Sequence, residues 1–199
     1  SWNGKNDTLE CLKSLQSIDY PNYSILLVDN GSTDGTADTI KLSFPNVEVI
    51  ETGENLGFAK GNNVGIQYAL DQGAEAILLL NNDTIVAPDF LSIMAESLYA
   101  EPDIGAVNPL IYYYNPPNVI WSAGGTIDNQ TGIAYQRHID EPDTGQLTAD
   151  EDIDYGIGAA LLIRREVIEK VGMLDPDFFL YYEETDWCSR ARAAGYRIV

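Results

Sequence analysis

Hydrophobic and polar positions alternate between helix-like and strand-like patterns along the first hundred residues. Leu9, Leu12 and Leu15 recur at helical spacing after Asn6 and Asp7, either of which would cap a helix that runs to about residue 17. Short, mainly apolar runs then alternate with amphipathic stretches. The runs predict buried strands at 24–28, 47–50 and 76–80, and the stretches predict helices at 36–42, 59–72 and 89–100. This alternation is typical of a largely parallel sheet covered by helices.

The pattern becomes irregular in the second half of the chain. Residues 112–148 are rich in Pro, Gly, Asn and Tyr, which predicts hairpins or an ordered loop laid over the sheet. Apolar residues return at 156–163. A short helix is then expected at 164–171, an aromatic strand or loop at 178–182, and a helix from about 184 to 194 with Gly195 at its C-cap. Because no repeat or linker interrupts its 199 residues, the chain is predicted to form a single domain.

Charge and cysteine usage narrow the possible partners. The chain has 31 acidic against 11 basic residues, a formal net charge of −20, which argues against a nucleic-acid backbone or an anionic membrane surface as the main partner. A nucleotide stays open, because a carboxylate-bound divalent cation reverses the local field. Cys11 and Cys188 form no metal-binding cluster, and we expect both to be buried thiols in a reducing compartment. No apolar run approaches the roughly 20 residues that a membrane span needs.

Polar side chains follow two of the predicted strands. Asp29 ends the first strand and opens a Gly-, Asp- and Ser-rich turn, and Asn82 and Asp83 follow the third strand. Both segments are compatible with ordinary strand-end turns, but ligands of parallel sheets bind beyond these ends. There Asp29 could accept a hydrogen bond from a base or ribose, and Asp83 could hold Mg²⁺ or Mn²⁺ together with phosphate oxygens. A calcium loop starting at Asn30 is rejected, because Lys41 stands where a bidentate Glu is required.

Three acids open the last predicted helix, and they have two interpretations. Glu183, Glu184 and Asp186 would complement the helix dipole, and Asp186 could pair with Arg190 one turn later. Alternatively, one of them is a general base whose proton affinity is raised by its acidic neighbours and by the aromatic segment 178–182. Other chemistries lack support, because the chain has no P-loop motif and a single histidine in a polar loop.

Four motifs together resemble one enzyme family. VDNGSTDGT at 28–36, NLGFAKGNNVG at 55–65, LLLNNDT at 78–84 and FFLYYEETDWCSRARAAGYRI at 178–198 occur in the order, and at roughly the spacing, seen in family-2 glycosyltransferases. The chain is most similar to the rhamnosyltransferase-like branch that serves bacterial and archaeal surface polysaccharides. The resemblance implies the α/β GT-A fold, with a mostly parallel central sheet flanked by helices. It also implies inverting, metal-dependent transfer of a sugar from a nucleotide diphosphate to a saccharide or lipid-linked saccharide acceptor.

The same resemblance implies which residues bind the donor. Asp29 would recognise the base with Asn3 beside it, Asn82 would approach the ribose, and Asp83 would be the ligand of Mn²⁺ or Mg²⁺. Asn62 stands where the family has an arginine that contacts the diphosphate. Lys60 is the residue that could compensate for the missing arginine. The donor is expected to be UDP- or dTDP-linked, and the branch points to dTDP-rhamnose.

The resemblance also implies the acceptor side of the site. Gly158, Ala159 and Ala160 match the segment that lines the reacting sugar and acceptor. Glu184 matches the acid that acts as catalytic base, although the family usually has Asp at this position; Glu183 and Asp186 are its alternatives.

Some expected segments of the family are missing from the sequence. The first strand should precede Trp2 and a later segment should follow Val199, so we interpret residues 1–199 as a single catalytic domain that is a fragment, with an open position in its sheet. Through those segments the protein could be peripheral to a membrane, and we expect it in the cytoplasm or at the inner face of the cell membrane. The absence of a QxxRW motif argues against a processive synthase.

Two other functions stay open. A nucleotidyltransferase shares the sheet plan and the metal requirement, but it would normally show a basic, Gly-rich signature, whereas residues 31–35 carry no Lys or Arg. A module that binds nucleotide sugars or carbohydrates without catalysis would keep the same motifs.

Overall fold

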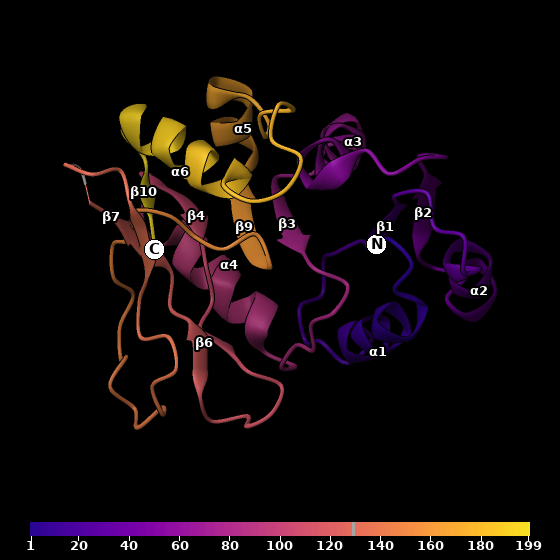
Figure 1. The fold of residues 1–199 in the computed structure, drawn as a ribbon, viewed down its shortest axis with the longest axis horizontal. Coiled ribbons are helices and arrows are strands. Elements are labelled where there is room, and N and C mark those ends of the chain that lie inside the picture. The colour runs from indigo at the N-terminus through magenta and orange to yellow at the C-terminus, as the bar shows by residue number, and fades with distance from the viewer. Residues whose placement is uncertain (129) are drawn as a thin grey trace.

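The computed structural model describes residues 1–128 and 130–199 as an α/β arrangement of helices around a mixed sheet (Figure 1). The helices are α1 (Lys5–Leu15), α2 (Thr36–Ser43), α3 (Gly57–Asp71), α4 (Phe90–Ala100), α5 (Arg165–Val171) and α6 (Glu183–Ala193). The strands are β1 (Leu26–Asp29), β2 (Glu48–Glu51), β3 (Ala76–Leu80), β4 (Ile104–Val107), β5 (Ile111–Tyr112), β6 (Ile120–Ser122), β7 (Gly125–Ile127), β8 (Ala134–Gln136), β9 (Ala160–Arg164) and β10 (Arg197–Ile198). The helices predicted from the sequence are confirmed, with small shifts at their ends.

Four strands form the central sheet in the order β10-β4-β9-β3. Because β9 is antiparallel to both β3 and β4, and β10 is parallel to β4, the strands β3, β4 and β10 all point the same way. The expected α/β fold with a central sheet flanked by helices is therefore confirmed. The sheet is mixed, because β9 is antiparallel to both of its neighbours while the other three strands share one direction. Leu80 pairs with Ala160, so the start of β9 lies beside the end of β3.

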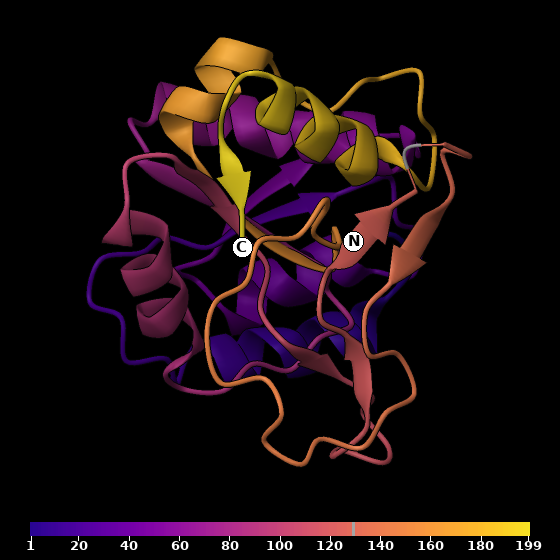
Figure 2. The ribbon, with the colours of Figure 1, turned by 90° about the vertical axis from the view of Figure 1, so that its left-hand side faces the viewer.

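Helices cover both faces of this sheet. In Figure 2, α3, α5 and α6 lie above it, and α4 and α1 lie on the other side. The side chains of β9 alternate between the two layers: Leu161 and Ile163 belong to the same buried cluster as Trp187 of α6, and Leu162 belongs to the cluster that holds Leu98 of α4. Because both faces are buried, the strand is apolar from Ala160 to Ile163 and shows no alternation there; only its last residue, Arg164, is charged.

A second, two-stranded sheet carries the first functional candidate. β1 and β2 pair in parallel, with Asp29 opposite Glu51. Ser1 extends this sheet, because its backbone nitrogen donates to the carbonyl of Val28 (2.8 Å) and its carbonyl accepts from the N–H of Asn30 (2.7 Å). Within the described residues, no ladder of hydrogen bonds joins β1 to β3. The strands predicted as one sheet thus lie in two.

The irregular region forms hairpins, as predicted. β5 pairs with β6 and β7 with β8, both antiparallel. The backbone of Gly125 in β7 passes directly beneath the ring of Tyr155, where a Cβ atom would lie 2.1 Å from Cζ of that tyrosine. Any side chain at this position would therefore displace the ring, and only glycine permits the close approach.

Three details of the sequence prediction are wrong. Helix α1 starts at Lys5 rather than at an Asn6 or Asp7 cap, because the carboxylate of Asp34 from a distant turn accepts its first N–H (3.2 Å). The two short strands β4 and β10 were not predicted. β4 contains Gly105, which is needed because a Cβ there would lie 2.8 Å from Cβ of Tyr196. Such strands are defined by their neighbours and leave little pattern in the sequence.

Both cysteines are buried and free, as expected. Among the described residues, no helix is both long and apolar enough to cross a membrane.

Candidate active site

The carboxyl end of β1 presents a buried carboxylate. Asp29 is 2% exposed; its Oδ1 accepts the N–H of Ser32 (2.7 Å), whereas its Oδ2 has no hydrogen-bond partner. Asn3 joins the same turn, because its Oδ1 accepts the N–H of Thr33 (2.8 Å) and its own N–H donates to Ser32 Oγ (2.9 Å). The structure therefore brings Asn3 and Asp29 to one turn and leaves one buried oxygen of Asp29 without a hydrogen-bond partner.

The carboxyl end of β3 presents Asp83 at the surface. Its neighbour Asn82 points toward α1, where its amide nitrogen donates to Thr8 Oγ1 (3.0 Å) and lies 2.7 Å from the position of a Cβ on Gly4. The amide donor of Asn82 is thus used inside the protein, which leaves its carbonyl oxygen for the predicted contact with a ribose. Asp83 is exposed and makes no ion pair among the described residues.

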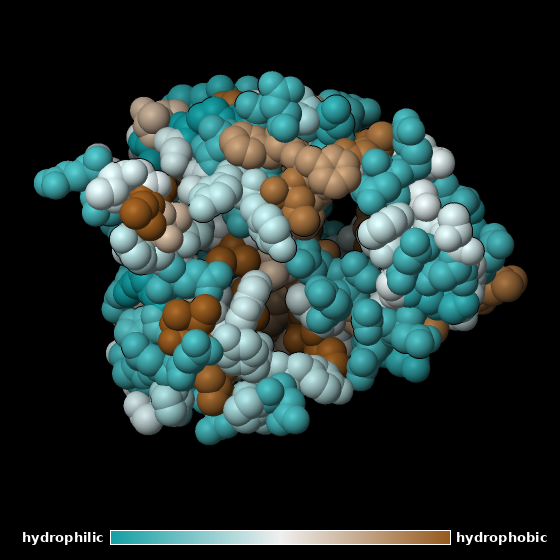
Figure 3. Space-filling model, in the orientation of Figure 1, coloured by the Kyte–Doolittle hydropathy of each residue, from teal (hydrophilic) through white to brown (hydrophobic). Residues whose placement is uncertain are grey.

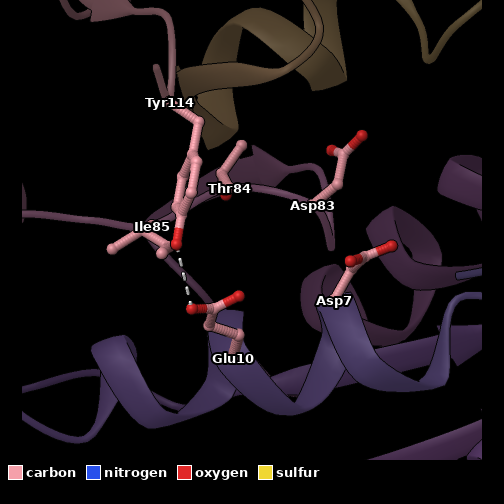
Figure 4. A pocket seen from close by; sticks show the side chains of 6 residues that line it. All are labelled: Asp7, Glu10, Asp83, Thr84, Ile85 and Tyr114. Carbon is pink, nitrogen blue, oxygen red and sulfur yellow. Dashed lines mark hydrogen bonds between the residues drawn. The ribbon is translucent and has the colours of Figure 1, made fainter. Parts of the chain in front are cut away.

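A small pocket next to Asp83 contains further acids that the sequence did not single out. Figure 4 shows Asp7 and Glu10 of α1 below Asp83, with Tyr114 above, whose hydroxyl reaches Glu10 Oε1 (3.4 Å). Thr84 completes the wall on the β3 side. The i,i+3 spacing of the two α1 acids places them on one helix face, but only the packing of α1 shows that this face meets Asp83.

The start of β9 lies against α6. The backbone of Asn81 donates to the carbonyl of Ala159 (2.9 Å), and a Cβ on Gly158 would lie 3.8 Å from the carboxyl carbon of Glu184 and 3.1 Å from Cζ of Phe58. Gly158 therefore touches the first turns of both α3 and α6. The predicted lining segment Gly158, Ala159 and Ala160 is buried, and its first residue, Gly158, lies against Glu184.

Glu184 has the properties of a general base. It is half-buried, and its Oε2 is buried without a hydrogen-bond partner. Burial raises the pKa of this carboxyl, and the backbone N–H groups of Glu184 and Gly158 partly offset the rise. A carboxylate with a raised pKa and a free lone pair is well suited to accept a proton from a substrate hydroxyl.

The two alternative acids differ from Glu184 in their contacts. Asp186 pairs with Arg190 (2.8 Å), as the i,i+4 interpretation predicted, and Arg190 also donates to two carbonyls of the α5–α6 connection. Glu183 is 3% exposed, with an unpartnered Oε2, and burial raises its pKa. Asp186 thus has a structural partner, and Glu183 is nearly closed off from solvent.

The first turn of α3 offers few hydrogen-bond donors to a diphosphate. The amide nitrogen of Asn62 donates to the carbonyl of Phe58 (3.0 Å) within the helix. The first N–H groups are also in use, because Leu56 donates to Asn30 Oδ1 (3.0 Å) and Gly57 to the side chain of Asn55 (2.9 Å). The side chain of Asn62 is therefore no substitute for an arginine, and the exposed Lys60, two residues earlier, is the nearest cation on this helix.

Replacing Glu183 by glutamine is expected to raise the melting temperature at neutral pH. Because burial raises the pKa of Glu183, the folded protein binds more protons than the unfolded chain between the ordinary Glu pKa of about 4.3 and the raised value. The carboxylate therefore reduces stability as pH rises through that window. The gain from Glu183→Gln should grow over the same window and vanish below about pH 4. Thermal melts at a series of pH values measure this, and a variant that melts lower at pH 7 would contradict it.

Comparison with known proteins shows the family to which the chain is similar. A model of the family described as glycosyl transferase family 2 matches residues 1–172. The low-salt glycan biosynthesis hexosyltransferase Agl10 of Haloferax volcanii is 27% identical over 186 residues, which cover 92% of this chain and 58% of that protein. The N-acetylglucosaminyl-diphospho-decaprenol L-rhamnosyltransferase of Mycobacterium tuberculosis is 26% identical over 210 residues, which cover 93% of this chain and 66% of that protein.

Solved structures show the same fold. The mannosyltransferase PcManGT of Pyrobaculum calidifontis, determined in complex with GDP-Man and Mn²⁺, superposes with a TM-score of 0.72 at 21% identity and covers 100% of this chain and 52% of that one. The chain thus spans between half and two thirds of the length of these proteins.

Proposed function

Because this chain belongs to glycosyl transferase family 2, we propose that it transfers a sugar, with inversion, from a nucleotide-diphosphate donor to a hydroxyl of a saccharide or lipid-linked saccharide. The observation that carries the proposal is Glu184, whose carboxyl group lies beside Gly158 and has one oxygen without a hydrogen-bond partner. The start of β9 adjoins the end of β3, so this base and Asp83 belong to the same edge of the central sheet. The names of the relatives support hexosyl or rhamnosyl transfer and a lipid-linked acceptor.

Glu184 would remove the proton from the acceptor hydroxyl as that oxygen attacks the anomeric carbon in line with the departing diphosphate. Inversion needs a single displacement and hence a single base, so no protein nucleophile is required. The acidic pair Glu183–Glu184 lies at the start of α6, and the raised pKa of Glu184 strengthens it as a proton acceptor.

The donor set around Asp83 fits a hard divalent cation only in part. Carboxylates of Asp83, Asp7 and Glu10 line one pocket, but no group of three acidic, His or Cys side chains among the described residues is arranged to hold a metal ion. Mg²⁺ and Mn²⁺ commonly bind through one or two carboxylates together with substrate phosphates. Asp83 would hold such an ion against the donor diphosphate, where the ion supplies Lewis-acid stabilisation of the leaving group. It would also relieve the repulsion between the donor and a chain of net charge −20.

Asp29 would read the base of the donor. Its free Oδ2 is buried at a strand end, and an ionised carboxylate accepts hydrogen bonds only. The imide N–H of uracil or thymine is a matching donor, which supports UDP- or dTDP-linked substrates. Asn3 keeps the turn of Ser32 and Thr33 in place beside it.

Replacing Asp29 by asparagine is expected to weaken binding of UDP and dTDP by roughly tenfold or more, the value of a hydrogen bond to a charged group. Titration calorimetry of both proteins with UDP, dTDP and CDP in the presence of Mn²⁺ measures the effect. Asp38→Asn is the matched control, because Asp38 is an exposed acid within helix α2 and does not lie at the end of a strand. Equal affinities for the two Asp29 forms would exclude this residue as the base reader.

Donor turnover decides among the three candidate functions. Release of a nucleoside diphosphate from a UDP- or dTDP-sugar supports the transferase. Formation of pyrophosphate from a nucleoside triphosphate and a sugar phosphate would identify a nucleotidyltransferase instead. Tight binding of nucleotide sugars without any turnover would leave a non-catalytic binding module.

A further inference from the structure

The connection before α6 exposes four large side chains in a row. Phe179, Leu180, Tyr181 and Tyr182, here called the aromatic strap, are 61%, 52%, 71% and 60% exposed. Monomeric proteins seldom leave contiguous apolar patches in water without a binding role. In Figure 3, tan and brown apolar residues lie among pale ones at the rim of a hollow in the middle of the visible face. The exposure of the strap therefore indicates a binding surface.

Both ends of the strap are fixed. The carbonyl of Phe179 accepts the N–H of Phe58 at the start of α3 (2.7 Å), and a Cβ on Gly57 would lie 2.7 Å from the Phe179 ring. At the other end, the carbonyl of Tyr182 accepts the N–H of Asp186 in the first turn of α6 (2.9 Å). The strap thus bridges the two helix starts that meet at Gly158, and in Figure 1 it runs between α6 and α3.

The backbone of the strap is held in an unfavourable conformation. Tyr181 and Tyr182 have φ angles of 71° and 72°, in the left-handed region that bulky residues rarely enter. Two successive residues in this region are a strained arrangement, and such strain concentrates at functional sites. Here it ends the strap with two tyrosines turned toward solvent, directly before Glu183 and Glu184.

The surroundings define the chemistry of the ligand. The strap carries no charge, and acids flank it on both sides, at Asp175 and Asp177 and at the start of α6. With a net charge of −20, this surface disfavours a bilayer with anionic headgroups. Tyrosine rings offer an apolar face and a polar hydroxyl, which suits a neutral, hydroxyl-rich ligand that is apolar on its ring faces.

We propose that Tyr181 and Tyr182 form the subsite for a neutral saccharide acceptor, on which its sugar ring stacks so that a hydroxyl reaches Glu184. This inference rests on the proposed glycosyl transfer and adds the position and the neutral, ring-stacking character of the acceptor. Because the strap and the base belong to one continuous segment, 179–184, an acceptor held by the rings lies beside the group that takes its proton. The residues proposed to hold the donor, Asp29 at the end of β1 and Asp83 after the end of β3, lie on other segments of the chain than the strap.

The test compares Tyr181→Ala with Tyr181→Phe, which keeps the ring, and with Tyr135→Ala. Tyr135 is similarly exposed (53%), but it lies on the β7–β8 hairpin at the edge of the molecule (Figure 1). The probes are octyl glycosides as neutral acceptors, with UDP- or dTDP-sugars and Mn²⁺. We expect Tyr181→Ala to raise the KM for the octyl glycoside by roughly tenfold or more, as for a truncated aromatic anchor, and to leave donor hydrolysis without acceptor within about twofold. Tyr181→Phe and Tyr135→Ala should stay within about threefold of the wild type in KM.

A binding readout makes the test independent of turnover. Saturation-transfer NMR should detect the octyl glycoside bound to the wild type and to Tyr181→Phe, and the signal should be lost in Tyr181→Ala. Thermal melts confirm that each variant is folded, and Leu180→Ser serves as a second strap variant if Tyr181→Ala melts below the assay temperature. An unchanged KM and NMR signal in the strap variants would overturn the inference. So would a loss of donor hydrolysis equal to the loss of transfer, which indicates a structural role.

Other occupants of the strap give different results. If the variants lose co-sedimentation with phosphatidylcholine vesicles but keep the acceptor KM, the strap binds a bilayer and the inference fails. If they abolish a dimer seen by sedimentation velocity but keep the KM, it binds a second copy and the inference also fails. A wild type that neither hydrolyses donor nor binds nucleoside diphosphates would refute the proposed function itself, whereas intact donor chemistry with an indifferent strap refutes this inference alone.

Discussion

Replacing Glu184 by glutamine is expected to lower kcat for sugar transfer by at least roughly a hundredfold, with little change in donor affinity. The substitution keeps the size of the side chain and removes its ability to take a proton. We propose that Asp29 and Asp83 hold the donor, so the Kd of the variant for UDP or dTDP should stay within about twofold of the wild-type value. Steady-state kinetics with a UDP- or dTDP-sugar and titration calorimetry on the same preparation separate the two effects.

A purely structural role for Glu184 makes a different forecast. Complementing the helix dipole is worth about 0.3–1 kcal/mol, so Gln would lower stability slightly and leave turnover nearly intact. Asp186→Asn is the matched control, because Asp186 lies in the same first turn but is paired with Arg190. We expect it to affect stability and to leave kcat close to that of the wild type. Near-normal turnover in Glu184→Gln would transfer the base role to Glu183.

The pH profile offers a second check on the same residue. A general base works only when ionised, and burial raises the pKa of Glu184. Activity should therefore be lost as pH falls through a value above the ordinary Glu pKa of about 4.3. In Glu184→Gln this acidic limb of kcat/KM should disappear from the residual rate, because the titrating group is gone.

Replacing Asp83 by alanine is expected to abolish the metal-dependent part of nucleotide binding. In the wild type, UDP or dTDP at about a hundred times its Kd should stabilise the folded state by about 2.7 kcal/mol, or roughly 5–10 °C in melting temperature for a chain of this size. This shift should require Mn²⁺ or Mg²⁺ and should largely vanish with a chelator. In Asp83→Ala, the nucleotide should raise the melting temperature, with or without metal, only by the small amount seen for the wild type in the presence of a chelator.

Two further acids make this experiment specific. Asp7 and Glu10 line the same pocket as Asp83 but belong to α1. If Asp83 alone holds the ion against the diphosphate, Asp7→Asn and Glu10→Gln should each retain most of the metal-dependent shift. Equal shifts with and without metal in the wild type would refute metal-linked binding, and a loss in Asp7→Asn as large as that in Asp83→Ala would make α1 part of the ion site.

Much of the architecture follows from local signals in the sequence. The run 76–80 is apolar at every position and becomes β3, whose two faces are buried by α3 and α4 layers. Gly73 and Gly195, with φ angles of 83° and 95°, end their helices as left-handed residues for which glycine is favoured. The i,i+4 pair of Asp186 and Arg190 was also predictable, because helical spacing alone brings the two side chains together.

The candidate site depended on the sequence in a different way. Asp29 and Asp83 could be identified from the sequence as candidate ligand-binding residues. Each follows a predicted strand, and ligands of parallel sheets bind beyond the carboxyl ends of the strands. The motif order added Gly158 and Glu184 as a resemblance, without any contact between them. Gly158 and Glu184 are 26 positions apart in the chain. Their contact depends on β9 lying antiparallel between β3 and β4, an arrangement that no local sequence pattern encodes.

By itself, the sequence determined the helices, the first three strands, the strand-end acids and the family resemblance, because periodicity, turn residues and motif spacing are properties of neighbouring positions. Only the tertiary structure decided that Asp34 caps α1, that Asn82 turns to Thr8, that Asp7 and Glu10 join Asp83, and that one oxygen of Glu184 is buried without a partner. The first three of these features are contacts between segments far apart in the chain. Burial and hydrogen-bond satisfaction depend on what packs against a group, and that is set by the assembled layers rather than by adjacent residues.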